Sequence, residues 1–226
     1  MRFNGVLLDI DDTLYDYQSA HGRALGEVVD RLSIQLTMDG ARIRNAFATA
    51  RRTIHVELRD TASSHNRLLY FQRMFELLEI NPLVYALDTY NLYWEVFLDH
   101  IEPFAGVCNF LEKIKNRKVC LVSDQSADIA YRKIKKLTLG HCATHLVTSE
   151  EAGKEKPHPY IFLLALQKLR LKAEEVCMIG DSYEKDIWGA TTLGMRAFWL
   201  NAGGKRELLN NLTTAFSNFA DLAEHF

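Results

Sequence analysis

The chain has 226 residues, 48% of them apolar by type, and its 27 Lys and Arg residues against 29 Asp and Glu residues leave a formal charge of -2. This length suffices for one large domain, or for a core domain with a smaller second domain. The near-neutral charge balance gives no support for binding to nucleic acid or to an anionic membrane surface.

The four cysteines are widely spaced and form no C-x-x-C pair: Cys108, Cys120, Cys142 and Cys177. We therefore expect buried, reduced thiols rather than disulfides or a metal site. No apolar run approaches membrane-spanning length, and the start of the chain lacks the pattern of a signal peptide. The expected location is the cytoplasm.

The first expected strand, residues 5–8 (Gly-Val-Leu-Leu), is apolar throughout, which is typical of a strand buried on both faces. Three carboxylates follow it directly, those of Asp9, Asp11 and Asp12. Buried carboxylates are costly unless a metal, a hydrogen-bond network or a substrate uses them. Asp9 and Asp11 are two residues apart and can project towards the same site, although a single Asp here could also simply cap the following helix.

An insertion separates this strand from the next. The strand pattern returns only near residue 118, roughly 100 residues later, whereas a βαβ crossover needs about a dozen or more. The gap contains four expected helices, at residues 17–32, 39–58, 63–78 and 84–100. Apolar residues recur at spacings of three and four in the third and fourth, which favours a helix-bundle core. We therefore predict a helical cap domain at residues 16–94, and a catalytic core domain at residues 1–15 and 95–226.

The remainder of the chain alternates strands and helices. Further strands are expected at residues 119–122, 145–148, 176–179 and 196–200, followed by a turn at residues 203–205 and a tail of short helices. This alternation predicts an α/β fold with a doubly wound, Rossmann-like parallel sheet. Because all strands of such a sheet end at one crevice, Asp9, Ser123, the loop with Lys154 and Lys156, and Asp181 should meet there.

The expected crevice would contain a repulsive group of up to four carboxylates: Asp9, Asp11, Asp181 and Asp186. Such a group needs a cation, and an all-oxygen ligand set suits Mg²⁺. The Ser123 hydroxyl and the Lys156 ammonium add donors for a phosphate group. One carboxylate could then attack the phosphorus, while another exchanges protons with the leaving oxygen and with water.

Four motifs together resemble the haloacid dehalogenase-like hydrolase superfamily. They are residues 9–13 (Asp-Ile-Asp-Asp-Thr), Ser123 at a strand end, Lys156 with Pro157, and residues 180–190 (Gly-Asp-Ser-Tyr-Glu-Lys-Asp-Ile-Trp-Gly-Ala). The insertion directly after the first motif is similar to members of that superfamily with a helical cap.

The resemblance implies a role for each matching residue. Asp9 would be the nucleophile and Asp11 the general acid/base. The expected phosphate-binding residues are Thr13, Ser123 and Lys156. The expected Mg²⁺ ligands are Asp9, the backbone carbonyl of Asp11 and Asp181, with Asp186 supporting the waters of the metal or orienting Lys156. Lys154 could reach the phosphate as Lys156 does, but the proline that follows Lys156 favours the latter.

These motifs predict a Mg²⁺-dependent phosphohydrolase that acts on a small phosphorylated metabolite, either a nucleotide monophosphate or a sugar phosphate. Superfamily members that resemble dehalogenases lack an acid/base Asp at the position of Asp11, so its presence argues for phosphate-monoester hydrolysis. A phosphomutase of the same fold stays open, as does a non-catalytic member that binds a phosphorylated ligand or a protein. A monomer requires no further assumption.

Overall fold

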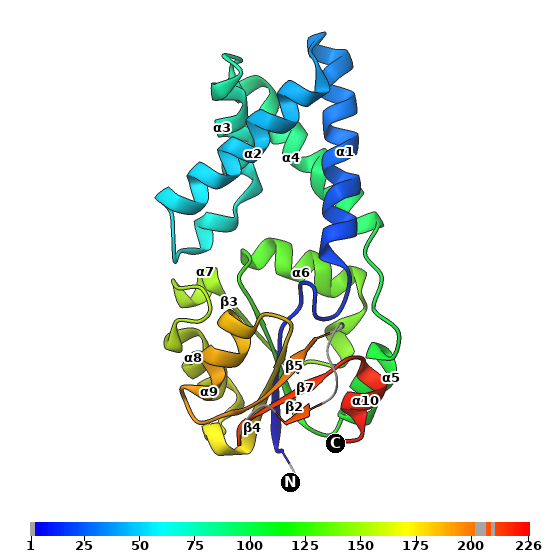
Figure 1. The fold of residues 1–226 in the computed structure, drawn as a ribbon, viewed down its shortest axis with the longest axis vertical. Coiled ribbons are helices and arrows are strands. Elements are labelled where there is room, and N and C mark those ends of the chain that lie inside the picture. Colours follow the sequence, from blue (N-terminus) through cyan, green and yellow to red (C-terminus); the bar gives the residue numbers. More distant parts are fainter. Residues whose placement is uncertain (1–2, 202–206, 209–210) are drawn as a thin grey trace. The chain divides into compact units, whose positions relative to one another are not determined.

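The computed structural model describes residues 3–201, 207–208 and 211–226 (Figure 1). The turn expected at residues 203–205 lies outside these. The chain divides into two compact units, one formed by Met1–Asp16 with Glu102–Phe226 and the other by Tyr17–Ile101. We call them the core unit and the helical unit.

A seven-stranded sheet forms the centre of the core unit, in the order β3-β2-β1-β4-β5-β7-β6. Its strands are β1 (Gly5–Leu8), β2 (Lys118–Ser123), β3 (His145–Thr148), β4 (Val176–Gly180), β5 (Arg196–Leu200), β6 (Glu207–Leu208) and β7 (Thr213–Phe216). All pairs are parallel except β6 with β7. The predicted α/β fold with a doubly wound parallel sheet is confirmed.

Strand β1 occupies the position at which the strand order reverses. The chain runs from β1 outward to β2 and β3, then returns to the other side of β1 as β4. Leu8 at the end of β1 is in register with Leu121 of β2 and with Ile179 of β4. The three strands therefore end together, at the topological switch point where α/β sheets bind ligands.

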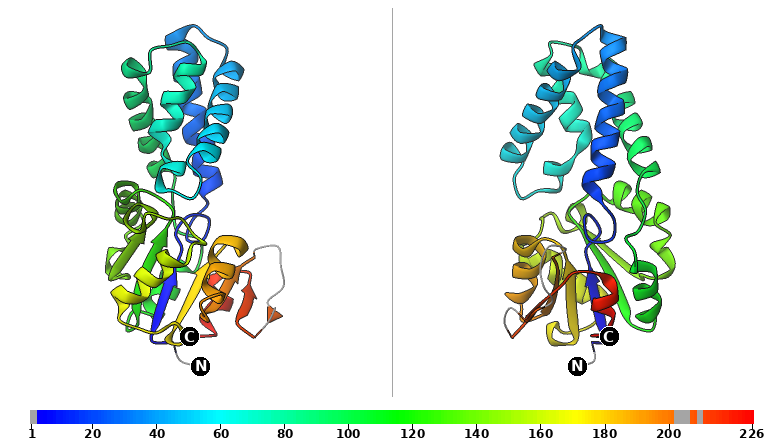
Figure 2. Two further views of the ribbon diagram at one scale, coloured as in Figure 1. Left: turned by 90° about the vertical axis from the view of Figure 1, so that its left-hand side faces the viewer. Right: turned by 45° about the vertical axis from the view of Figure 1, so that its right-hand side comes forward.

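Helices pack on the sheet of the core unit (Figure 2). They are α5 (Val107–Lys113), α6 (Ala127–Lys136), α7 (Ser149–Ala152), α8 (Pro159–Leu169), α9 (Trp188–Thr191) and α10 (Phe219–Ala223), with a π-helical turn η4 (Tyr183–Ile187) and the 3-10 turns η2 (Leu139–His141) and η3 (Ala173–Glu175). Leu7 of β1 packs in one apolar cluster with Phe162 of α8. Val6 and Leu8 are equally buried but lie outside that cluster, as the alternation of a strand covered on both faces requires.

The tail differs from the prediction of short helices alone. Among the tail residues that the structure describes, 207–208 and 211–226, only α10 is helical, whereas Thr213–Phe216 forms β7 and adds a parallel strand beside β5. Four residues carry too little periodicity to predict a strand, and the pairing with β5 decides their conformation.

The helical unit consists of α1 (Tyr17–Leu36), α2 (Gly40–Glu57), α3 (Arg67–Leu77) and α4 (Pro82–Asp99), with a 3-10 turn η1 (Ala62–His65) before α3. Side chains of Asp39, Asn66 and Asn81 cap the N-termini of α2, α3 and α4, each accepting a backbone N–H. Such caps fix where each helix begins. Among the residues described, no helix combines the length and apolar character needed to cross a membrane.

The four cysteines are free. Cys120 in β2 and Cys177 in β4 are buried, as expected for strand residues, but Cys108 is exposed and Cys142 is partly exposed. The prediction of burial is therefore right for the two strand cysteines only.

Candidate active site

The predicted site residues converge at the carboxyl ends of three neighbouring strands. Asp9 directly follows β1, Ser123 is the last residue of β2, and Asp181 directly follows β4. Ser123 is buried, with 2% of its surface exposed. The parallel register of these strands gathers side chains from three distant parts of the chain at one edge.

The Asp9 carboxylate lies in a nearly closed environment and is 5% exposed. Lys156 Nζ donates to its Oδ1 at 2.5 Å, and the Thr13 hydroxyl lies 2.8 Å from its Oδ2. Burial raises the pKa of Asp9 to about 7, an effect that Lys156 opposes and the nearby Asp186 reinforces. Both Asp9 oxygens are thus held in fixed positions.

Lys156 connects two of the carboxylates. Its Nζ also donates to Asp186 Oδ1 at 2.7 Å, and the side chain is buried. Burial alone would lower the pKa of Lys156, but Asp186 and Asp9 raise it well above the ordinary value, so the ammonium stays charged. Lys154 is exposed, so of the two lysines Lys156 is the one in contact with the carboxylates.

Asp181 lies against the same threonine. The Thr13 hydroxyl is 3.1 Å from Asp181 Oδ1 and accepts the Asp181 backbone N–H at 3.0 Å. Burial, and then the charge of Asp9, raise the pKa of Asp181 to about 7. The Thr13 hydroxyl lies within hydrogen-bond distance of both carboxylates and so links Asp9 to Asp181. It has a single proton and can donate to only one of them at a time. Thr13 was predicted to bind phosphate, and here its hydroxyl contacts these two carboxylates.

Asp186 reaches the site from the π-helical turn η4. Its Oδ2 accepts the backbone N–H of Ser182 at 3.1 Å, and burial raises its pKa. A Cβ at Gly180 would overlap the Asp186 carboxyl group, so the last residue of β4 must be glycine for this approach.

The carboxylates of Asp9, Asp181 and Asp186 form a possible metal site. Asp9, Asp181 and Asp186 each offer an oxygen, and these oxygens lie within 4.8 Å of one another. Burial and mutual repulsion raise the pKa of all three, which is the situation that a bound divalent cation relieves. The donor set, carboxylate oxygens only, fits Mg²⁺.

Asp11 has its own set of partners. Tyr15 donates to its Oδ1 at 2.5 Å, Gln125 Nε2 donates to its Oδ2 at 3.3 Å, and Lys133 Nζ lies 2.7 Å from both oxygens. Its carboxylate is not among the three that could hold a metal in the described part of the chain. Lys133, Tyr15 and Gln125 were not predicted as site residues.

Asp124 supports the loop that holds Lys156. It accepts the Lys156 backbone N–H at 2.8 Å and the Lys185 ammonium at 2.9 Å. Although burial opposes it, the charges of Lys156 and Lys185 hold the pKa of Asp124 below its usual value. Asp124 is thus a further residue of the site that sequence reasoning did not assign.

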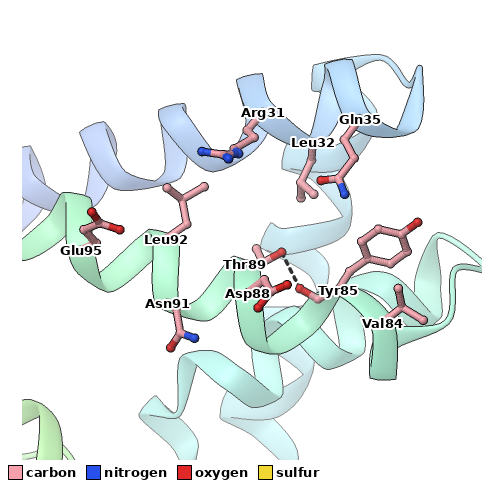
Figure 3. Close-up of a pocket in the computed structure, with 10 residues that line it drawn as sticks. All are labelled: Arg31, Leu32, Gln35, Val84, Tyr85, Asp88, Thr89, Asn91, Leu92 and Glu95. Atoms are coloured by element: carbon pink, nitrogen blue, oxygen red, sulfur yellow. Dashed lines mark hydrogen bonds between the residues drawn. The ribbon is translucent and has the colours of Figure 1, made fainter.

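The helical unit contains a separate pocket of about 510 Å³ between α1 and α4 (Figure 3). Its walls carry charges of both signs, from Arg31, Asp88 and Glu95. None of the predicted site residues lines it, so it is distinct from the carboxylate cluster of the core unit.

Residues 3–194 match the family model of the haloacid dehalogenase-like hydrolases. The chain belongs to this family. The family model covers all four motifs and the whole helical unit, and it ends beyond α9. The family predicted from the motifs is confirmed.

Relatives that are similar to this chain include proteins named as phosphatases. The ribulose-1,5-bisphosphate 5-phosphatase of Halopiger xanaduensis is 30% identical over 84% of this chain and 81% of its own length. The glyceraldehyde 3-phosphate phosphatase of Methanothermobacter thermautotrophicus is 30% identical over 87% of this chain and 85% of its own. Among solved structures, the 2-haloacid dehalogenase of Pseudomonas syringae matches 98% of this chain and 97% of its own, at 25% identity and a TM-score of 0.76.

Proposed function

We propose that this enzyme is a Mg²⁺-dependent phosphatase that hydrolyses a small phosphorylated metabolite through an aspartyl-phosphate on Asp9. The observation that carries the proposal is the arrangement around Asp9, a carboxylate in contact with the buried Lys156 ammonium and flanked by Asp181 and Asp186. The names of its phosphatase relatives support the same class of reaction, phosphoric monoester hydrolysis.

In the first step an Asp9 oxygen attacks the phosphorus, and the bond between phosphorus and the leaving oxygen breaks. Asp11 gives a proton to that leaving oxygen, so the product departs as an alcohol. Lys156, with Ser123 and Thr13 at the same edge of the sheet, donates to the phosphoryl oxygens and stabilises the charge that develops on them.

In the second step a water molecule attacks the phosphorus of phospho-Asp9. Asp11, now a carboxylate, accepts a proton from this water, and the bond between Asp9 and phosphorus breaks. Inorganic phosphate leaves and both aspartates return to their starting states.

The metal would be held by Asp9, Asp181 and the backbone carbonyl of Asp11, with Asp186 beside them. Bound there, Mg²⁺ would neutralise charge on the phosphoryl group. We assign Asp186 the additional task of holding Lys156 in place, which its 2.7 Å contact with the ammonium supports.

The substrate class is that of the phosphatase relatives, sugar and triose phosphates, with nucleotide monophosphates as a further candidate. We propose that the helical unit serves as the cap that selects the leaving group. Its several arginines, among them Arg51, Arg52 and Arg59 around one groove of α2, supply positive charge for an anionic metabolite.

The test is phosphate release from a panel containing an aryl phosphate, glyceraldehyde 3-phosphate, ribulose 1,5-bisphosphate and a nucleotide monophosphate, with and without Mg²⁺. Asp9→Asn serves as the blank. Metal-dependent release that disappears in Asp9→Asn supports the proposal and identifies the substrate class. If no compound releases phosphate although Mg²⁺ binds, the proposal is wrong and a phosphomutase or a non-catalytic role is favoured.

The phosphomutase alternative keeps Asp9 and Asp11 and differs in the fate of phospho-Asp9, which returns its phosphoryl group to a substrate hydroxyl. Isomerisation of a sugar phosphate without net phosphate release would favour it. The dehalogenase reaction of the structural relative is disfavoured by Asp11, and release of halide from a 2-haloacid would overturn that judgement.

A further inference from the structure

Helix α6 of the core unit contains a lysine on its buried face. Ile129, Lys133 and Leu137, the last directly after the helix, recur at a spacing of four and are all buried, as is Ala130. The side chain of Lys133 is 0% exposed, whereas its neighbours Lys135 and Lys136 are exposed. Burying an ammonium is costly unless it has a well-placed partner.

That partner is Asp11. Lys133 Nζ lies 2.7 Å from each of the two Asp11 oxygens, a symmetric contact that leaves the carboxylate little freedom to rotate. The Tyr15 hydroxyl and the Gln125 amide hold the same group, one at each oxygen. The Tyr15 ring also lies 5.9 Å from the Lys133 ammonium.

The Asp11 carboxylate remains reachable despite these contacts, since its side chain is 24% exposed. A purely structural ion pair has no need for an open side, but a group that exchanges protons does. Two of the three aspartates of the first motif thus contact separate lysines, Asp9 with Lys156 and Asp11 with Lys133.

We propose that Lys133 is a positioning residue that holds the Asp11 carboxylate in the orientation needed for proton transfer to and from the reacting oxygens. This rests on the proposed function, in which Asp11 is the general acid/base. Lys133 touches neither substrate nor the phosphoryl group and acts only through Asp11.

The test uses the dependence of the first step on the leaving group. A 4-nitrophenolate ion leaves without a proton, whereas the alkoxide of a sugar phosphate must be protonated as it departs. Single-turnover experiments, with enzyme in excess over substrate, measure this step for 4-nitrophenyl phosphate and for the best alkyl phosphate of the panel. The variants are Lys133→Met, Lys133→Arg and the exposed control Lys135→Met.

We expect Lys133→Met to slow the single-turnover step about 100-fold with the alkyl phosphate, within the range attributed to acid/base catalysis. With 4-nitrophenyl phosphate the same step should change less than about threefold, because no proton is needed there. Lys133→Arg should restore part of the loss, since a guanidinium can also pair with both oxygens. Lys135→Met should behave as wild type.

Equal losses with both leaving groups, or no loss with either, would overturn the proposal. If Lys133→Met fails to fold, the single-turnover rates of Lys133→Arg and Gln125→Ala are compared for the same two substrates. If each of these folded variants is slowed equally with both leaving groups, the proposal is wrong. Failure of the proposed function itself is distinguishable, because wild type would then release no phosphate or would not depend on Asp9.

Discussion

The core unit and the helical unit each bury a cation, but in opposite surroundings. Lys156 in the core unit contacts two carboxylates, those of Asp9 and Asp186. Arg67 at the start of α3 is 4% exposed, yet it donates to the His65 carbonyl at 2.6 Å and to the Tyr17 hydroxyl. Within the described residues no carboxylate forms an ion pair with Arg67.

Aromatic rings replace carboxylates around Arg67. Its guanidinium lies 5.5 to 5.6 Å from the ring centres of Tyr17, Tyr70 and Trp94. Such rings stabilise a cation without carrying a charge of their own. A buried charge therefore indicates chemistry where several ionisable groups surround it, as at Lys156, and indicates packing where neutral groups satisfy it, as at Arg67.

The largest expected effect in the core unit comes from Asp9→Asn. The amide cannot act as the nucleophile, so turnover should be abolished, while the fold should persist because the change is nearly isosteric and relieves repulsion with Asp186. Phosphate release measures the loss of turnover, and thermal unfolding measures whether the fold persists. Near-normal activity would remove Asp9 as nucleophile.

Lys156→Ala should follow, with activity reduced at least about 100-fold, since the phosphoryl group loses its fixed cation. The matched control is Lys154→Ala, two residues away and exposed, which should cost much less. The measurement is the steady-state rate of each variant and of wild type with the best substrate. If Lys154→Ala were the more damaging change, the phosphate-binding lysine would have to be reassigned.

Replacing Lys156 and Arg67 each with methionine separates the two kinds of buried cation. Lys156→Met leaves Asp9 and Asp186 without their cation, which should lower the free energy of unfolding by about 3–5 kcal/mol in Mg²⁺-free buffer. Arg67→Met leaves no buried carboxylate behind, so the loss should be smaller, at most about 2 kcal/mol. Urea unfolding measures both values, and a larger loss for Arg67→Met would contradict the distinction.

A further effect concerns His21 in the helical unit. Burial, with the charges of Arg67 and Arg51, lowers the pKa of His21 from 6.5 to about 4. The unfolded chain therefore binds more protons than the folded one between these pH values, and stability falls as the pH falls from 6.5 towards 4.

His21→Gln should reduce the loss of stability on acidification, and the same change at the exposed His141 should not. The measurement is the free energy of unfolding at pH 7 and at pH 4.5. If both variants lose as much stability as wild type on acidification, His21 is not the group responsible.

The sequence predicted the first five strands and the four helices of the insertion because their periodicities are long or their apolar runs are clear. The strand Thr213–Phe216 could not be predicted, since its pairing with β5 and β6 distinguishes it from an irregular tail. Elements defined by their own pattern were thus predictable, and elements defined by their neighbours were not.

The site follows the same division. Asp9, Ser123, Lys156 and Asp181 could be predicted because each stands next to a strand end or in a recognisable loop. Lys133 could not, because three lysines in ten residues of α6 are typical of a solvated helix face. One signal was available: Lys133 alone of the three falls on the stripe defined by Ile129 and Leu137.

The covalent intermediate on Asp9 can be looked for directly. The enzyme would be mixed with its best substrate and Mg²⁺, quenched rapidly in acid, digested and examined by mass spectrometry. We expect a peptide containing Asp9 that carries one phosphoryl group and that is absent in Asp9→Asn. Turnover at the normal rate with no phosphorylated Asp9 peptide at any quench time, or with the phosphoryl group on another residue, would contradict the proposed intermediate.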